Sequence, residues 1–122
     1  MVGRYPISTL SKTLVCASLF ASGDDLKELI REKYPELTNL LICMWGKESS
    51  FGKFLIGDRG KAIGHFQIWI SKHPVSYNCA MDFECSLDYT AKMIKKGKGN
   101  LWTSYKGCLT EYPVKVDQQN KI

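Results

Sequence analysis

The chain has 122 residues, which is the size of a single globular domain with a core of its own. Apolar residues make up 44% and charged residues 24%, as in ordinary globular proteins, and no apolar run approaches the roughly 18 residues that cross a bilayer, so we expect no stable membrane insertion. The formal net charge of +5 suits an anionic partner such as nucleic acid, lipid head groups or an acidic cell-wall polymer.

Residues 1–23 resemble a short signal peptide, because two basic residues precede an apolar run over residues 13–21 and small residues at its end suit cleavage. Removal of this segment would leave four of the five cysteines, an even number that suits a secreted protein. We therefore expect an extracellular or periplasmic location. The alternative is that residues 9–21 form an amphipathic helix of the mature protein. Four cysteines allow three pairings, of which the favoured one is Cys79–Cys85 with Cys43–Cys108.

Two helices are predicted before residue 49. The first has Asp24 as its N-cap and ends at Tyr34, because Pro35 disfavours helical geometry in the residue before it. Pro35 then opens a second helix over residues 36–47, where its missing N–H costs nothing. This second helix delivers Glu48 at its end.

Glu48 lies on the apolar face of the second helix. The residues 3, 4, 7, 8 and 11 positions before it are Trp45, Met44, Leu41, Leu40 and Leu37. A carboxyl group on that face is partly removed from water, which disfavours its charged form and raises its pKa. A glutamic acid that keeps its proton near neutral pH can serve as a general acid. The alternative is that Glu48 sits at a frayed helix end and reaches water.

Residues 49–68 have glycines at positions 52, 57, 60 and 64, which predict tight turns or a small irregular sheet with positive φ at several positions. A compact lobe of this kind can hold Asp58 opposite the end of the preceding helix, with Phe66, Gln67 and Trp69 nearby. The two aromatic rings suit a hydrophobic core as well as a platform for a ligand.

The two carboxyl groups have different predicted surroundings, a buried helix end for Glu48 and a polar loop for Asp58. Such a difference pushes their pKa values apart, so that one group is protonated and the other ionised. Glycoside hydrolysis needs this combination, an acid for the leaving oxygen and a carboxylate for the developing oxocarbenium charge. No spacing typical of a zinc site, a nucleophile elbow or a phosphate-binding loop occurs, so we expect no metal and no organic cofactor.

In the second half of the chain, Asp82 is the predicted N-cap of a helix that ends at Gly97. The most basic stretch, residues 92–98, falls at its end and has no interleaved aromatic residues, so it fits a solvated helix end rather than a nucleic-acid surface.

Asn100 is the predicted N-cap of a last short helix that ends at Tyr112. The predicted domain therefore covers residues 24–112, and residues 113–122 form a polar C-terminal tail.

Two motifs around the carboxyl groups resemble those of known enzymes. Residues 48–52, Glu-Ser-Ser-Phe-Gly, resemble the first motif of soluble lytic transglycosylases and goose-type lysozymes, and residues 64–68, Gly-His-Phe-Gln-Ile, resemble the motif that follows it. Residues 57–68 and the cysteine-bounded segment 79–85 are also similar to invertebrate-type lysozymes. The resemblance covers most of the predicted domain.

This resemblance implies a lysozyme-like α+β fold, mostly helical, with a small glycine-rich or short antiparallel β lobe beside a substrate cleft. It implies that Glu48 is the general acid and that Asp58, as in the invertebrate type only, is the second catalytic carboxylate. The implied substrate-contact residues are Ser49, Gly64, Phe66, Gln67 and Tyr105. Tyr105 matches the tyrosine of a later Tyr-Asn motif, although Lys106 stands where the asparagine belongs.

The activity that the resemblance implies is cleavage of the β-1,4 bond between N-acetylmuramic acid and N-acetylglucosamine in peptidoglycan. We expect a monomer that acts on glycan strands and has no nucleic-acid partner. Hydrolysis as a muramidase is favoured if Asp58 faces the cleft, whereas a lytic transglycosylase would use Glu48 as acid and then base and form a 1,6-anhydro ring. The alternatives of another class are a non-catalytic glycan-binding protein and membrane disruption through residues 92–98.

Overall fold

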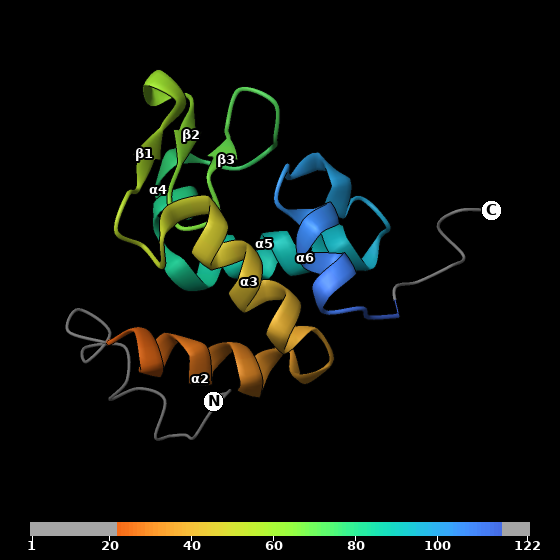
Figure 1. The fold of residues 1–122 in the computed structure, drawn as a ribbon. Helices are drawn as coiled ribbons and strands as arrows, with labels where there is room; N and C mark the ends of the chain where they lie inside the picture. Colours follow the sequence, from red (N-terminus) through yellow and green to blue (C-terminus); the bar gives the residue numbers. More distant parts are fainter. Residues whose placement is uncertain (1–21, 116–122) are drawn as a thin grey trace.

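The computed structural model describes residues 22–115, so the predictions for residues 1–21, including the signal peptide, lie outside the described residues. The chain is mostly helical with one small antiparallel sheet, which confirms the predicted α+β class (Figure 1). The helices are α2 (Gly23–Lys33), α3 (Thr38–Ser49), α4 (Tyr77–Met81), α5 (Phe83–Lys95) and α6 (Tyr105–Glu111). The strands are β1 (Ile56–Gly57), β2 (Ala62–Ile63) and β3 (Ile68–Trp69), and the 3-10 helices are η2 (Pro35–Leu37), η3 (Asp58–Gly60) and η4 (Gly99–Leu101). No helix in this part of the chain is long and apolar enough to cross a membrane.

The N-cap of α2 is Ser22, so the prediction of Asp24 is wrong. The Ser22 hydroxyl accepts a hydrogen bond from the backbone N–H of Asp25, and the Asp25 carboxylate accepts one from the backbone N–H of Ser22, both at 3.3 Å. This reciprocal arrangement satisfies two N–H groups, whereas a single side-chain cap satisfies one. The predicted end of the helix is confirmed, since Tyr34 is its C-cap and Pro35 follows.

Helix α3 runs through the centre of the hydrophobic core. Pro35 opens the 3-10 helix η2 rather than α3, so α3 begins at Thr38 and ends at Ser49, two residues later at each end than the predicted range of 36–47. The predicted apolar face is confirmed, because each of its members is at most 1% exposed: Leu37, Leu40, Leu41, Met44 and Trp45. Full burial of one such side chain contributes about 1.5–3 kcal/mol, so this face is a main source of folding free energy.

Both favoured disulfides are present. Cys43–Cys108 joins α3 to α6 with 5.8 Å between the Cα atoms, and Cys79–Cys85 joins α4 to α5 with 5.2 Å. Helix α5 has the predicted N-cap, because the Asp82 carboxylate accepts a hydrogen bond from the backbone N–H of Cys85 at 2.8 Å.

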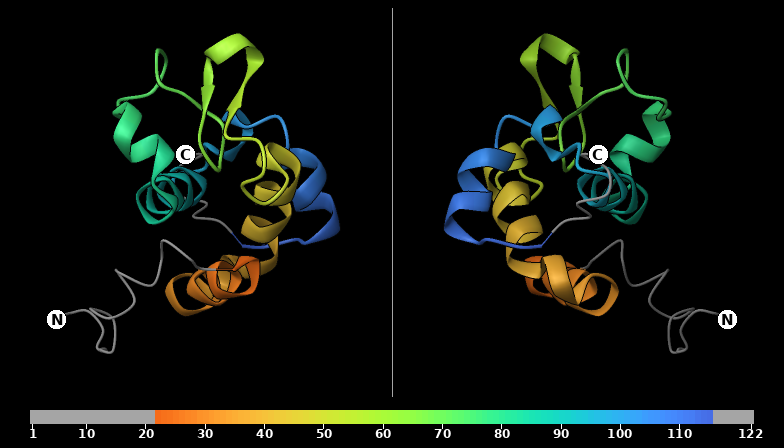
Figure 2. Two further views of the ribbon diagram at one scale, coloured as in Figure 1. Left: turned by 90° about the vertical axis from the view of Figure 1, so that its left-hand side faces the viewer. Right: turned by 90° about the vertical axis from the view of Figure 1, so that its right-hand side faces the viewer.

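The three short strands form a sheet in the order β1-β2-β3, in which Ile63 of the central strand pairs with Ile56 on one side and Ile68 on the other. In both views of Figure 2 the β1–β2 hairpin stands at one end of the molecule and α2 lies at the other. The predicted positive φ angles occur at Ser50, Phe51, Gly52, Asp58, Arg59, Gly60, Gly64 and Gln67. Gly64 is also required by packing, because a Cβ at this position would overlap the carbonyl group of Ala80.

The last helix begins later than predicted. Asn100, its predicted N-cap, lies inside η4, and α6 starts at Tyr105. Gly99, the first residue of η4, packs so closely on the Tyr105 ring that any Cβ there would overlap it. Trp102 between them points inward, and its indole N–H donates a hydrogen bond to the carbonyl oxygen of Phe66 at 2.8 Å.

Candidate active site

A groove with a volume of about 520 Å³ opens between the sheet and the segment that precedes α6, at the C-terminal end of α3. Figure 1 shows the strands above the C-terminal end of α3 and α6 beside that helix. The residues that line the groove are Glu48, Asp58, Ala62, Gln67, Ile68, Trp69, Lys72, His73, Leu101, Trp102 and Thr103. Both predicted carboxyl groups are therefore in one groove.

Glu48 is half-buried in the last turn of α3. Its Oε2 accepts a hydrogen bond of 2.6 Å from the hydroxyl of Ser104. Burial raises the pKa of Glu48 above its ordinary value, because the charged form loses water, and the hydrogen bond from Ser104 acts in the opposite direction. The net shift is upward, which is the direction that a general acid requires.

Ser104 is brought to Glu48 by the packing of α6 on α3. The two residues are 56 positions apart in the sequence. The Cys43–Cys108 disulfide links the same two helices. Cys43 lies about one turn from Glu48 and Cys108 about one turn from Ser104, so the disulfide holds the serine hydroxyl against the carboxyl group. No motif around Ser104 singled it out.

Asp58 lies at the start of η3, in the loop that joins β1 to β2, with a φ of 51°. It is exposed, and within residues 22–115 its carboxylate has no hydrogen bond or ion pair. The structure thus gives Glu48 and Asp58 the unlike surroundings that the sequence predicted. Their catalytic roles stay predictions.

Gln67 is the one predicted substrate-contact residue that lines the groove. Its side-chain amide donates hydrogen bonds to the carbonyl oxygens of Leu55 at 3.1 Å and Gly64 at 3.0 Å. These bonds tie together the two sides of the sheet lobe, so Gln67 shapes the wall of the groove as well as facing it.

The other four predicted contact residues do not line the groove. Ser49 is buried, and its hydroxyl accepts a hydrogen bond from the backbone N–H of Gly52 at 2.9 Å. Phe66 is fully buried in the core, Tyr105 is buried against η4, and Gly64 packs on α4. In this structure all four build the scaffold around the groove.

Two aromatic residues of the groove lining, His73 and Trp102, were not predicted as parts of the site. His73 lines the groove, and its Nδ1 lies 2.7 Å from the hydroxyl of Tyr89. Its ring also lies 5.6 Å from that of Trp102, between centroids. Burial lowers the pKa of His73, which favours the neutral imidazole.

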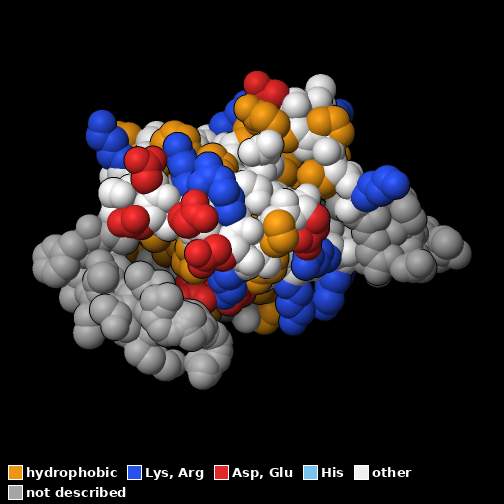
Figure 3. Space-filling view, turned by 90° about the horizontal axis from the view of Figure 1, so that it is seen from below, with side chains coloured by type: hydrophobic (Ala, Val, Ile, Leu, Met, Phe, Trp, Pro, Cys, Tyr) orange, Lys and Arg blue, Asp and Glu red, His pale blue; other side chains and the backbone are white. Residues whose placement is uncertain are grey.

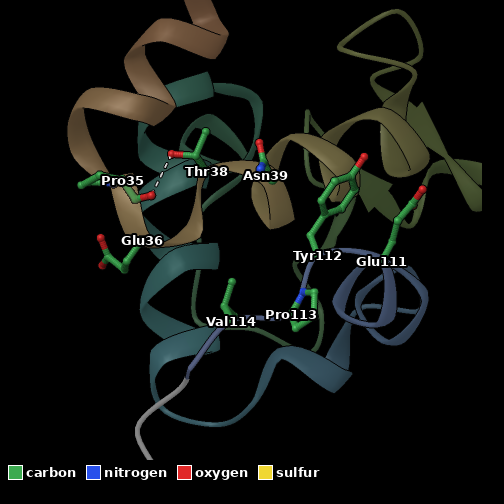
Figure 4. A pocket seen from close by; sticks show the side chains of 8 residues that line it. All are labelled: Pro35, Glu36, Thr38, Asn39, Glu111, Tyr112, Pro113 and Val114. Carbon is green, nitrogen blue, oxygen red and sulfur yellow. Dashed lines mark hydrogen bonds between the residues drawn. The ribbon is translucent and has the colours of Figure 1, made fainter.

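A second, smaller hollow of about 320 Å³ lies between the start of α3 and the end of α6 (Figure 4). Its lining residues are Pro35, Glu36, Thr38, Asn39, Glu111, Tyr112, Pro113 and Val114. The Thr38 hydroxyl donates a hydrogen bond to the Pro35 carbonyl oxygen at 3.2 Å, so part of its polar surface is already satisfied. None of the predicted site residues lies there.

Residues 22–115 contain no group of three or more histidine, cysteine, aspartate or glutamate side chains placed to hold a metal ion. The side chains that line the groove supply carboxyl, imidazole, ammonium and amide groups. Comparisons of the chain with protein-family models, with curated proteins and with solved structures find no match.

Proposed function

We propose that this protein is a muramidase with a lysozyme-like fold, which hydrolyses the β-1,4 bond between N-acetylmuramic acid and N-acetylglucosamine in peptidoglycan. One observation carries the proposal: Glu48, half-buried and with a raised pKa, lines the same groove as the exposed Asp58. Glycoside hydrolysis uses such a pair of carboxyl groups in unlike surroundings.

In the proposed reaction the protonated Glu48 donates its proton to the glycosidic oxygen as the bond from that oxygen to the anomeric carbon breaks. The carboxylate of Asp58 stabilises the positive charge that develops on the sugar. Water then adds to the anomeric carbon, and its proton returns to Glu48. The hydroxyl of Ser104 keeps the Glu48 carboxyl group in a fixed orientation through these steps.

The groove also has apolar surface for sugar rings. Trp69 of β3 is half-buried and Leu101 of η4 is 55% exposed, and both line the groove. Pyranose rings have apolar faces that pack against such side chains, as ligands pack on the apolar linings of binding sites in general. An extended glycan strand is therefore a suitable occupant.

The position of Asp58 supports hydrolysis over transglycosylation. A lytic transglycosylase needs a single carboxyl group and closes a 1,6-anhydro ring without water. A second carboxylate in the groove is used only by the hydrolytic route. Two disulfides in a chain of this size support secretion, since such bonds persist in oxidising compartments, and the net positive charge assists encounter with an anionic cell wall.

The test is the Glu48→Gln variant in a turbidity assay on a peptidoglycan suspension. Glutamine has the shape of glutamic acid and can accept the Ser104 hydrogen bond, but its amide has no acidic proton to transfer. We expect lysis to fall by about 10²- to 10⁴-fold, the usual contribution of a general acid. The matched control is Glu32→Gln, because Glu32 is exposed on α2, and it should lyse at the wild-type rate.

Near wild-type lysis by Glu48→Gln would overturn the proposal. Mass analysis of the digest distinguishes the two glycan reactions, because hydrolysis leaves reducing ends and transglycosylation leaves 1,6-anhydromuramyl ends. Wild-type protein that sediments with peptidoglycan but never clears it would be a glycan-binding protein. If the wild-type protein makes lipid vesicles leak and the Glu48→Gln variant does so equally, the activity is membrane disruption instead.

A further inference from the structure

The wall of the groove that β3 provides carries two ammonium groups on one aromatic ring. The Nζ atom of Lys61 lies 5.6 Å and that of Lys72 lies 5.3 Å from the ring centre of Trp69. Trp69 and Lys72 both line the groove. A tryptophan ring attracts cations more strongly than other side-chain rings do, so it holds both lysines at this wall.

Some basic side chains elsewhere on the molecule, Arg31, Lys33 and Lys95, form ion pairs with acidic neighbours. On the face that α2 covers, the two signs of charge are intermixed (Figure 3). The ion pairs of the described residues are Lys33 with Glu84 and Asp88, Arg31 with Glu28, and Lys95 with Glu36.

Basic residues outnumber acidic ones in the sheet lobe. Residues 50–76 contain one acidic residue, Asp58, and four basic ones: Lys53, Arg59, Lys61 and Lys72. Within the described part of the chain none of these four forms an ion pair. Lys61 and Lys72 therefore bring two positive charges without an acidic partner among the described residues to one ring of the groove wall, and these charges attract an anion.

We propose that Lys61, Lys72 and Trp69 form an anion subsite, which binds a carboxylate of the glycan strand or of its stem peptide while the indole ring contacts the adjoining sugar. The inference rests on the proposed function and makes it more specific. The groove would then select acidic glycans over neutral ones of the same backbone. Lys61 and Lys72 would determine specificity without taking part in bond cleavage.

The test compares one glycan with and without its charge. Peptidoglycan stripped of phosphate-containing polymers is divided in two, and the carboxylates of one half are converted to amides. We expect the wild-type protein to cleave the free-carboxylate form about 5- to 30-fold faster, which is the range that two partly exposed charge contacts supply. The preference should shrink as salt is added, because these contacts are screened.

The informative protein is the double variant Lys61→Gln with Lys72→Gln. Its matched control is the double variant Lys92→Gln with Lys96→Gln, at the exposed end of α5. Both carry the same change of charge. The groove variant should lose the preference by slowing only on the free-carboxylate form, and the control should keep it. Equal slowing of the groove variant on both forms, or an unchanged preference, would overturn the anion subsite.

Binding to the same two materials, measured by co-sedimentation of the Glu48→Gln protein, gives a readout that needs no cleavage. A wild-type protein that cleaves neither material would refute the muramidase proposal, and the binding preference would still decide for or against the subsite. A different outcome is binding that disappears when the phosphate polymers are removed and does not change on amidation. It would show that the lysines bind phosphate and would refute the proposed carboxylate ligand.

Discussion

Loss of the Cys43–Cys108 disulfide is expected to destabilise the protein about twice as much as loss of the Cys79–Cys85 disulfide. The two bridges have sequence separations of 65 and 6 residues. A cross-link lowers the entropy of the unfolded chain more when it closes a longer loop, which gives about 4 kcal/mol for the long loop and about 2 kcal/mol for the short one. Against a typical total stability of about 5–15 kcal/mol, the first loss is severe.

The two losses should also differ in their effect on activity. The Cys43–Cys108 bridge joins α3, which carries Glu48, to α6, which follows Ser104. The other bridge joins α4 to α5, away from the groove lining. Without the long bridge the Ser104 hydroxyl is held less firmly against the carboxyl group. We therefore expect weaker lysis at temperatures where this variant is still folded, and unchanged lysis without the short bridge.

Each bridge is removed by replacing both of its cysteines with alanine, and the free energy of unfolding is measured in urea. Each variant is extrapolated with its own slope, because an uncrosslinked unfolded chain exposes more surface and changes that slope. Equal losses for the two variants, or a larger loss for the short loop, would refute the argument from loop length. Full lysis by the variant without the long bridge would refute its positioning role.

Four further outcomes are expected. Ser104→Ala removes the hydrogen bond that lowers the pKa of Glu48, so the alkaline limb of the profile of kcat/KM against pH should move to higher pH; a limb that stays in place would exclude this role. Burial raises the folded-state pKa of Glu48 above its ordinary value of 4.5, so this group favours folding below that value and loses the effect as the pH rises. The melting temperature of Glu48→Gln relative to that of the wild type should therefore rise as the pH increases above 4.5, with no such trend well below that value. Gly64→Ala should cost more than about 2 kcal/mol in urea unfolding because its Cβ meets the backbone of α4, whereas Gly60→Ala, at a similar φ in open space, should cost about 1 kcal/mol. Trp102→Phe leaves a buried carbonyl oxygen without its donor and should cost about 1–3 kcal/mol in the same assay.

The parts of the fold that depend on neighbouring residues were predictable. The apolar face of α3 follows from its spacing, and the start of α5 follows from Asp82, whose partner is three residues ahead. The wrong N-cap of α2 was avoidable for the same reason, because Ser22 and Asp25 have the spacing of a capping box. Each of these features is decided within one or two turns of helix.

The parts of the site that depend on distant contacts were not predictable in this way. Ser104 reaches Glu48 across 56 residues, and His73 meets Tyr89 across 16, so no local pattern relates them. The motif residues of the glycine-rich stretch were expected to contact substrate, but most of them turn inward. Phe66 is an example, since it fills the core and its carbonyl oxygen accepts a hydrogen bond.

The half-burial of Glu48 is set by the place at which α3 stops. Ser50 adopts a left-handed conformation with φ of 52°, and its N–H donates to the carbonyl oxygen of Gly46 at 2.9 Å, so the helix ends directly after Ser49. Glu48 therefore continues the apolar face of α3 but lies where the core gives way to the groove. The helix stop thus places this side chain in the groove and sets the half-burial by which it holds its proton.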